Sequence, residues 1–195
     1  MSAVQAPYGL RAVNELGGLP YAGSTRQFPI SSSSANIYNG SVVAVNTSGL
    51  VTLVTTVGSD ASPFPAGVVG VFVGCTYVNA QGQTIYAQYY PTGTTGAIAY
   101  VIDDDRAVFQ VQANGTLGQT ALGANVVFAA AQTGSTSTGN STTAISTTLA
   151  PTATIAFKVI GFVESTTSTV GDAFTDVLVK FNVGSHAYNT GLGVA

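Results

Sequence analysis

Few residues of this chain could take part in acid–base, nucleophilic or metal chemistry. Its 195 residues include five Lys or Arg, eight Asp or Glu, one His and one Cys. His186 could act as a general base only beside a nucleophile and a carboxylate, and no Gly-x-Ser-x-Gly motif or comparable pattern supplies them. A lone His after the last strand-like run is typical of a structural residue. Cys75 cannot form an internal disulfide and lies in an alternating apolar run, which predicts a small buried hydrophobic residue.

One cluster of acids, Asp103-Asp104-Asp105, could suggest a Ca²⁺ site, because hard cations bind carboxylate oxygens. Adjacent residues in a turn point apart, however, and the Gly and distal Glu of an EF-hand loop are absent. We expect the tip of a hairpin in which Arg106 offsets part of the repulsion. The glycines of residues 67–70 lack the Gly-Lys-Ser/Thr of a phosphate loop. The sequence therefore predicts no catalytic residues, no metal site and no cofactor, and we expect no enzyme.

The low charge also limits the partners that this chain could bind. The net charge is −3, and the cations Arg11, Arg26, Arg106, Lys158 and Lys180 are scattered. No basic stripe for phosphates is visible, so nucleic acid is an unexpected partner. The longest apolar run, residues 66–75, is about half as long as a membrane span, and the start of the sequence lacks the pattern of a secretory signal. A surface rich in hydroxyls and poor in charge nevertheless resembles that of extracellular proteins, and a virion protein would combine these properties.

The pattern of apolar residues predicts an all-β fold. Leu, Glu, Lys and Arg, which favour helices, are scarce. Short runs rich in Val, Ile, Phe and Tyr alternate instead with Gly, Asn, Ser and Pro, which is typical of strands and turns. These runs span residues 41–46, 50–56, 68–78, 83–90, 97–102, 107–113, 125–130, 155–164 and 177–183. About nine short strands at this spacing indicate a sandwich or a barrel.

Two segments differ from this pattern. Residues 1–36 contain apolar residues without a period, and we interpret them as an extended N-terminal arm that orders on a partner; a disordered tail is the alternative. The core domain would then comprise residues 37–195. Within it, residues 133–148 are rich in Ser and Thr, and we expect a loop with a short strand near residues 141–146. The arm residues expected to contact a capsid or another subunit are Tyr8, Leu10, Arg11, Leu16, Leu19, Tyr21 and Phe28.

The order of several segments resembles a group of virion structural proteins. The segments are Tyr8-Gly-Leu-Arg-Ala-Val13 followed by Leu16-Gly-Gly, then residues 101–112, 138–142, 157–162 and 171–182, with His186 after them. The resemblance is to proteins of tailed bacteriophages, especially phages of aquatic bacteria, that are taken as head decoration or cement proteins. It covers most of the chain. It implies binding to the outer surface of a capsid, with the major capsid protein as partner, and no chemistry.

The leading hypothesis is therefore a capsid decoration protein that assembles as a homotrimer on the virion exterior. A tail, fibre or head-spike protein that binds host glycans is the main alternative, with Tyr89, Tyr90 and Tyr188 as candidate contacts. The long repeats and coiled coils that are common in fibres are absent. A cell-surface or S-layer type of protein is a third possibility, and an enzyme is the least favoured one.

Overall fold

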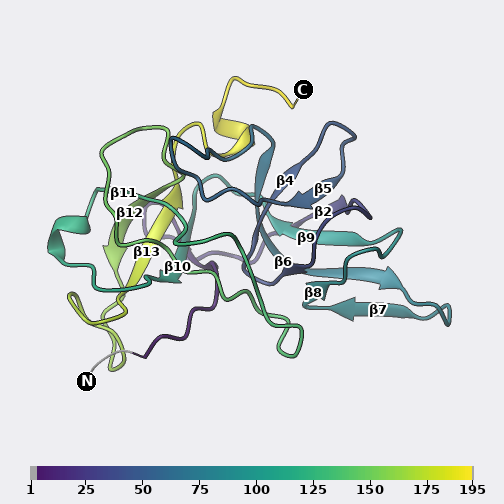
Figure 1. Ribbon diagram of the computed structural model, residues 1–195, viewed down its shortest axis with the longest axis horizontal. Coiled ribbons are helices and arrows are strands. Elements are labelled where there is room, and N and C mark those ends of the chain that lie inside the picture. Colours follow the sequence, from purple (N-terminus) through teal and green to yellow (C-terminus); the bar gives the residue numbers. More distant parts are fainter. Residues whose placement is uncertain (1–3, 195) are drawn as a thin grey trace.

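The computed structural model describes residues 4–194, and these residues form two main antiparallel sheets. Figure 1 shows the first sheet on the left and the second on the right. The first sheet contains, in spatial order, β1 (Arg11–Glu15), β10 (Ala107–Gln112), β13 (Asp176–Phe181), β12 (Phe157–Phe162) and β11 (Asn125–Val126). The second contains β2 (Arg26–Pro29), β9 (Ile98–Ile102), β6 (Val68–Val78), β4 (Val42–Val45) and β5 (Val51–Leu53), with β7 (Thr84–Ala87) paired to the far half of β6. The prediction of an all-β fold is confirmed.

Smaller elements complete the fold. Strands β3 (Ile37–Tyr38) and β8 (Tyr89–Tyr90) form a two-stranded sheet. Two single-turn 3₁₀ helices follow later in the chain, η1 (Gln119–Ala121) and η2 (Ala187–Asn189). Within residues 4–194, no helix has the length and apolar character that a membrane crossing would require.

Each of the nine predicted runs contains a strand, but one connection differs from the expectation. Strands β9 and β10 belong to different sheets and do not pair. The prediction of a hairpin around Asp103-Asp104-Asp105 is therefore wrong. The turn instead carries the chain from the second sheet to the first. A turn of three Asp residues and one Arg has the same local chemistry whether the flanking strands pair or separate, so the sequence does not distinguish the two arrangements.

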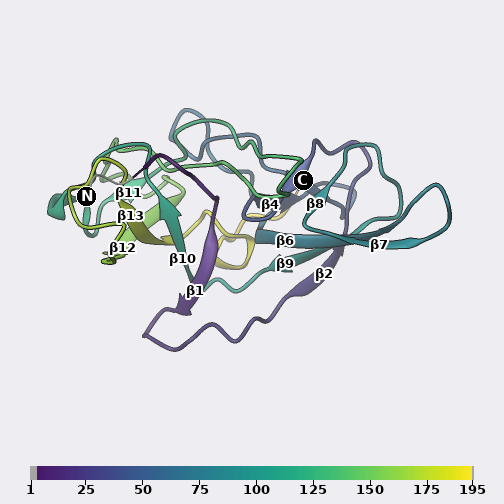
Figure 2. The ribbon, with the colours of Figure 1, turned by 90° about the horizontal axis from the view of Figure 1, so that it is seen from below.

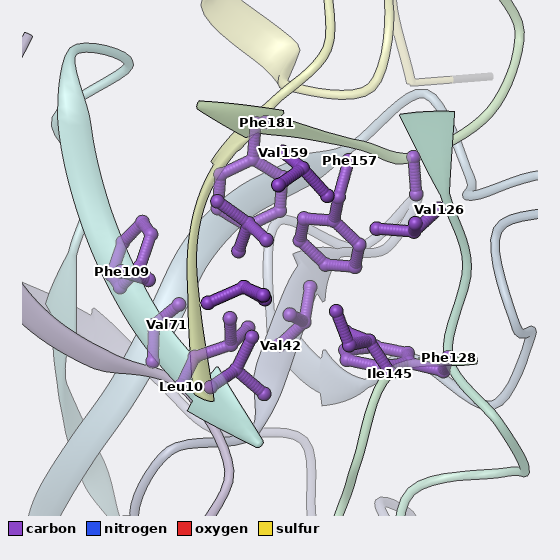
Figure 3. Packing of buried hydrophobic residues seen from close by; sticks show 14 of the residues in the cluster. Leu10, Val42, Val71, Phe109, Val126, Phe128, Ile145, Phe157, Val159 and Phe181 are labelled. Atoms are coloured by element: carbon purple, nitrogen blue, oxygen red, sulfur yellow. The ribbon is translucent and has the colours of Figure 1, made fainter. Parts of the chain in front are cut away.

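The main hydrophobic core lies between the two sheets. Figure 3 shows Phe109, Phe157 and Phe181 of the first sheet beside Val42 and Val71 of the second. Neighbouring phenylalanine rings of this core have centroids 5.0 to 5.7 Å apart in tilted or edge-to-face arrangements, which are favoured geometries for aromatic pairs. The core thus joins the two sheets into one body.

A second core covers the opposite face of the second sheet. It contains Phe72 and Val101 from the sheet, together with Ile30, Ile37 and Tyr90 from the segments that cover it. Because both faces of this sheet are buried, the central strand β6 consists mostly of apolar and glycine residues rather than alternating with polar ones. This explains why its sequence pattern is the clearest in the chain.

The Ser/Thr-rich segment, residues 133–148, is a loop as expected and has a fixed path, but the short strand expected near residues 141–146 is wrong, since only isolated bridges form there. Isolated bridges join Asn140 to Asn39, and Ile145 to both Ala113 and Phe128. Ile145 is fully buried in the main core. Just before the segment, the side-chain nitrogen Nε2 of Gln132 donates hydrogen bonds to the backbone carbonyls of Val42, at 3.0 Å, and of Val54, at 2.7 Å. The side chain of Ile145 and the buried hydrogen bonds of the Gln132 side chain therefore anchor this loop to the core.

The N-terminal segment adds one edge strand to each sheet. Strand β1 pairs with β10, and β2 pairs with β9. Figure 2 shows the connection between β1 and β2 passing outside the body. The apolar residues without a period predict an extended arm that orders on a partner, whereas residues 11–15 and 26–29 pair with strands of the protein's own two sheets. Both strands are at sheet edges and contain no fully buried residue, which explains why their residues show no clear apolar alternation.

Candidate functional site

The seven residues expected as arm contacts occupy different environments. Leu10 is 2% exposed and belongs to the main core, while Tyr21 and Phe28 pack partly buried against the main and the second core, respectively. Leu16 and Leu19 are 40% and 60% exposed. They lie on one turn, in which the Glu15 amide donates to the Leu19 carbonyl at 2.7 Å. Leu16 and Leu19 are therefore the two apolar members of the set that face solvent.

Tyr8 and Arg11, the remaining two, lie together beside strand β13. The Tyr8 hydroxyl donates to the Asp176 carboxylate at 3.0 Å, and the Arg11 guanidinium lies 4.4 Å from the centre of the Tyr8 ring. Burial raises the pKa of Tyr8, and the negative charge of Asp176 adds to this effect. Burial also raises the pKa of Asp176, although the Tyr8 hydrogen bond and Arg11 oppose the change. The cluster attaches the N-terminal segment to the first sheet.

A second polar cluster lies where β2, the turn after β9 and the C-terminal segment meet. Arg26 Nε is 2.9 Å from Asp103 Oδ2, and the Tyr188 hydroxyl donates to the same carboxylate oxygen at 2.9 Å. Arg26 also donates to the Tyr188 hydroxyl at 2.8 Å. Arg106, which is expected to offset the repulsion among these acids, donates a hydrogen bond from its guanidinium to the Leu16 carbonyl instead. Arg26 is therefore the ion-pair partner of Asp103.

His186 lies next to this cluster and has a structural position. Its side chain is fully buried. Its Nδ1 accepts a hydrogen bond from the backbone amide of Tyr188 at 3.3 Å, and this bond caps the start of η2. Burial lowers the pKa of His186, while the nearby carboxylates act in the opposite direction. A buried imidazole that caps a helical turn is poorly placed to exchange protons with a substrate.

Cys75 and the acids also lack the surroundings of reactive groups. Cys75 is 1% exposed, and burial raises the pKa of its thiol to about 11. Because the thiolate is the reactive form, this thiol is unreactive near neutral pH. Among residues 4–194, no group of three or more His, Cys, Asp or Glu side chains could hold a metal ion.

The tyrosines proposed as glycan contacts are mostly committed to other interactions. Tyr90 is fully buried, and its hydroxyl donates to the Thr94 carbonyl at 2.8 Å, so its prediction as a glycan contact is wrong. Tyr89 stacks on Tyr38 with ring centroids 5.9 Å apart. Tyr188 is half exposed but bound to Arg26 and Asp103.

Tyr86 is an exposed aromatic residue that is not among the predicted glycan contacts. It is 78% exposed and lies opposite Thr76 on the β6–β7 hairpin. Tyr86, Gly74, Gln88 and Tyr100 line a pocket of about 250 Å³, and the hydroxyls of Tyr100 and Thr76 are hydrogen-bonded at 2.8 Å. The alternation in β7 could have identified Tyr86, because Thr84 and Tyr86 share the polar face of that strand.

Comparison of the chain with protein-family models, with curated proteins and with solved structures found no match.

Proposed function

We propose that this chain is a structural virion protein that binds the outer surface of a bacteriophage capsid and stabilises it, as a decoration or cement protein. The resemblance of its segments to such virion proteins is the starting point of the proposal. Its partners would be the major capsid protein and other copies of the chain, with a homotrimer as the expected assembly. The protein would act through its surfaces and catalyse no reaction.

The packing of the body supports this role. A protein that holds capsid subunits against internal pressure needs a rigid scaffold, and the second sheet is packed on both faces. Polar side chains such as Gln132 and Asn182 are buried and bind backbone carbonyls of distant segments. Such buried hydrogen bonds make local opening costly.

The exposed turn that carries Leu16 and Leu19 is the observation that carries the proposal. Two exposed leucines are close together on this turn. One backbone hydrogen bond closes the turn, from the Glu15 amide to the Leu19 carbonyl, and another joins it to the first sheet, from the Leu16 amide to the Arg106 carbonyl. Apolar side chains on a rigid, projecting element can insert into a partner surface without a large loss of conformational entropy. In a chain with so few charges, we infer that this turn contacts the capsid.

Particles that lack the protein provide the test. Their DNA should be released at a lower temperature or under a milder osmotic shock, and purified protein added back should restore stability. Because charge contributes little, binding should persist in 1 M NaCl. Cryo-EM of the particles should show hundreds of copies arranged as trimers on the capsid exterior.

Variants of the turn give the matched comparison. A double substitution, Leu16→Ser with Leu19→Ser, should weaken binding to stripped capsids at least tenfold while the fold stays intact. Leu122→Ser is the control, since Leu122 is 48% exposed but lies beside η1, in another part of the chain. Unchanged DNA release from particles without the protein would contradict the proposal.

A spike protein that binds host glycans is the second candidate, and the pocket at Tyr86 favours it. Sugar rings stack on exposed aromatic faces, and Tyr86 and Tyr100 border a shallow pocket that contains no charged residue. If particles without the protein kept their heat stability but failed to adsorb to host cells, this candidate would replace the first. Tyr86→Ala should then abolish adsorption.

A further inference from the structure

Three polar residues form one row across the first sheet. Asn125 of β11 lies directly opposite Lys158 of β12, and Lys158 lies directly opposite Lys180 of β13. Directly opposite residues of neighbouring antiparallel strands point to the same face of a sheet. The adjacent residues Val126 and Phe157 are fully buried in the main core, so the row lies on the outer face of the sheet.

The two lysines of this row are an unfavourable pair. Like charges directly opposite each other destabilise paired strands, yet two of the five cations in the chain stand in this arrangement. Within residues 4–194, the ion pair that forms is between Arg26 and Asp103. Neither lysine of the row therefore has a carboxylate partner among the described residues, and an anion at the row would relieve the repulsion.

Asn125 adds a buried acceptor with no partner. The residue is 4% exposed, and its backbone exchanges two hydrogen bonds with Ala150, each of 3.0 Å. Its side-chain nitrogen donates to the Thr152 carbonyl at 2.8 Å, whereas Oδ1 has no hydrogen-bond partner. An unpaired buried acceptor is costly, so this oxygen indicates a missing donor.

A pocket of about 380 Å³ lies at the same place. Asn125 and Lys158 form part of its wall, and Leu149 and Pro151 supply an apolar side. A pocket of this size suits a small ligand. Its wall therefore combines a cation, an apolar surface and the side chain of Asn125, whose buried Oδ1 has no partner.

We propose that this pocket binds a hexuronic acid residue of an acidic polysaccharide. The sugar carboxylate accepts hydrogen bonds from Lys158 of the pocket wall and from Lys180, which lies directly opposite Lys158 outside that wall. Asn125 Oδ1 is buried in the unliganded protein, and a small rotation of this side chain lets a ring hydroxyl donate to it. The C–H face of the ring packs on Leu149 and Pro151. An inorganic anion offers no apolar face for these two residues, and an acidic side chain of a protein fills less of the pocket. This site does not depend on the role at the capsid.

Titration of the purified chain with trigalacturonic acid tests the site, with NMR shifts or calorimetry as the readout. We expect saturable binding that weakens as NaCl is raised, because the lysines are partly exposed. Lys158→Gln and Lys180→Gln should each reduce the affinity at least fivefold. Arg106→Gln removes the same charge elsewhere and should leave the affinity unchanged. Without ligand, Lys158→Gln should melt at the same or a higher temperature, since it removes the like-charge pair.

Three results would overturn the proposal. The first is the absence of binding at millimolar trigalacturonic acid, and the second is equal binding by the Lys158→Gln variant. The third is a preference for another anion: if inorganic phosphate bound as well as the sugar acid, the row would recognise charge alone, and if an acidic peptide bound better, the partner would be a protein. Neutral trigalactose should give no signal.

Discussion

Arg26 of strand β2 and Asp103 of the turn after β9 form an ion pair with a distance of 2.9 Å between Nε and Oδ2. The pair joins an N-terminal edge strand to the turn that carries the chain between the sheets. Tyr188 of the C-terminal segment binds both partners. Three regions that are far apart in the sequence thus meet at one carboxylate.

The energy of this ion pair should be small. The Asp103 side chain is 14% exposed, but the Arg26 side chain is 61% exposed, so water screens the pair, and such pairs contribute about 0–1 kcal/mol. A double-mutant cycle with Arg26→Ala and Asp103→Asn, measured by urea unfolding, should give a coupling free energy below about 1 kcal/mol at low salt and less in 1 M NaCl. The pair Arg106→Ala and Asp103→Asn serves as the uncoupled control. A coupling of several kcal/mol would show that the contact is buried.

The N-terminal segment should contribute to folding through Leu10 rather than Leu19. Leu10 is 2% exposed in the main core, so Leu10→Ala should lower the free energy of unfolding by about 2–5 kcal/mol. Leu19 is 60% exposed, and Leu19→Ala should change stability by no more than about 0.5 kcal/mol. The same denaturation curves test the predicted boundary between residues 36 and 37: if neither substitution lowered stability, residues 1–36 would be an arm outside the core.

Gly70 should be intolerant of any side chain. It has a φ angle of +143°, and a Cβ atom there would overlap the Ile102 carbonyl oxygen. Gly70→Ala should therefore cost about 3 kcal/mol or more, from backbone strain and overpacking together. Gly118→Ala is the matched control, because Gly118 has an ordinary φ of −91° and no neighbour within 4 Å of an added Cβ. Equal urea midpoints for the two variants would contradict the close approach of β6 to the end of β9.

Stability should fall as the pH is lowered from 7.5 to 5.5. Burial lowers the pKa of His186 below 6.5, so the unfolded chain binds a proton in this range more readily than the folded one. Protonation therefore favours unfolding as the pH passes below the unfolded value. Thermal melts should show the decrease, and His186→Gln should remove most of it, because this is the single His of the chain. A melting temperature that is constant or rises on acidification would be the opposite result.

Local chemistry explains which parts of the fold could be predicted. The turns after β4 and β6 carry local signals in their residue types. The side-chain oxygens of Asn46 and Asn79 each accept hydrogen bonds from two backbone amides, and Gly49 and Gly82 adopt positive φ angles. The pairing of strands is not local, and the separation of β9 from β10 left no mark on the turn between them. Ile145 is similar: one apolar residue in a Ser/Thr-rich run does not reveal that it enters the core.

The candidate sites follow the same division. The burial of Cys75 and the structural position of His186 could be read from single residues and their neighbours. The row of Asn125, Lys158 and Lys180 depends on the register of three strands that are far apart in the sequence, so no local pattern indicates it. Tyr86 could have been found from the alternation in β7.

The pairing of Arg11 with Gln110 has a consequence for how fast this chain can fold. Strand β1 has no partner until β10 has been synthesised, and the first sheet closes a very long loop when the two meet. Long loops lose more entropy on closure, and proteins dominated by such pairings fold in about milliseconds to seconds rather than microseconds. Until β1 arrives, the edge of β10 stays open to strands of other chains, which makes crowded synthesis the stage at which misassembly is most expected.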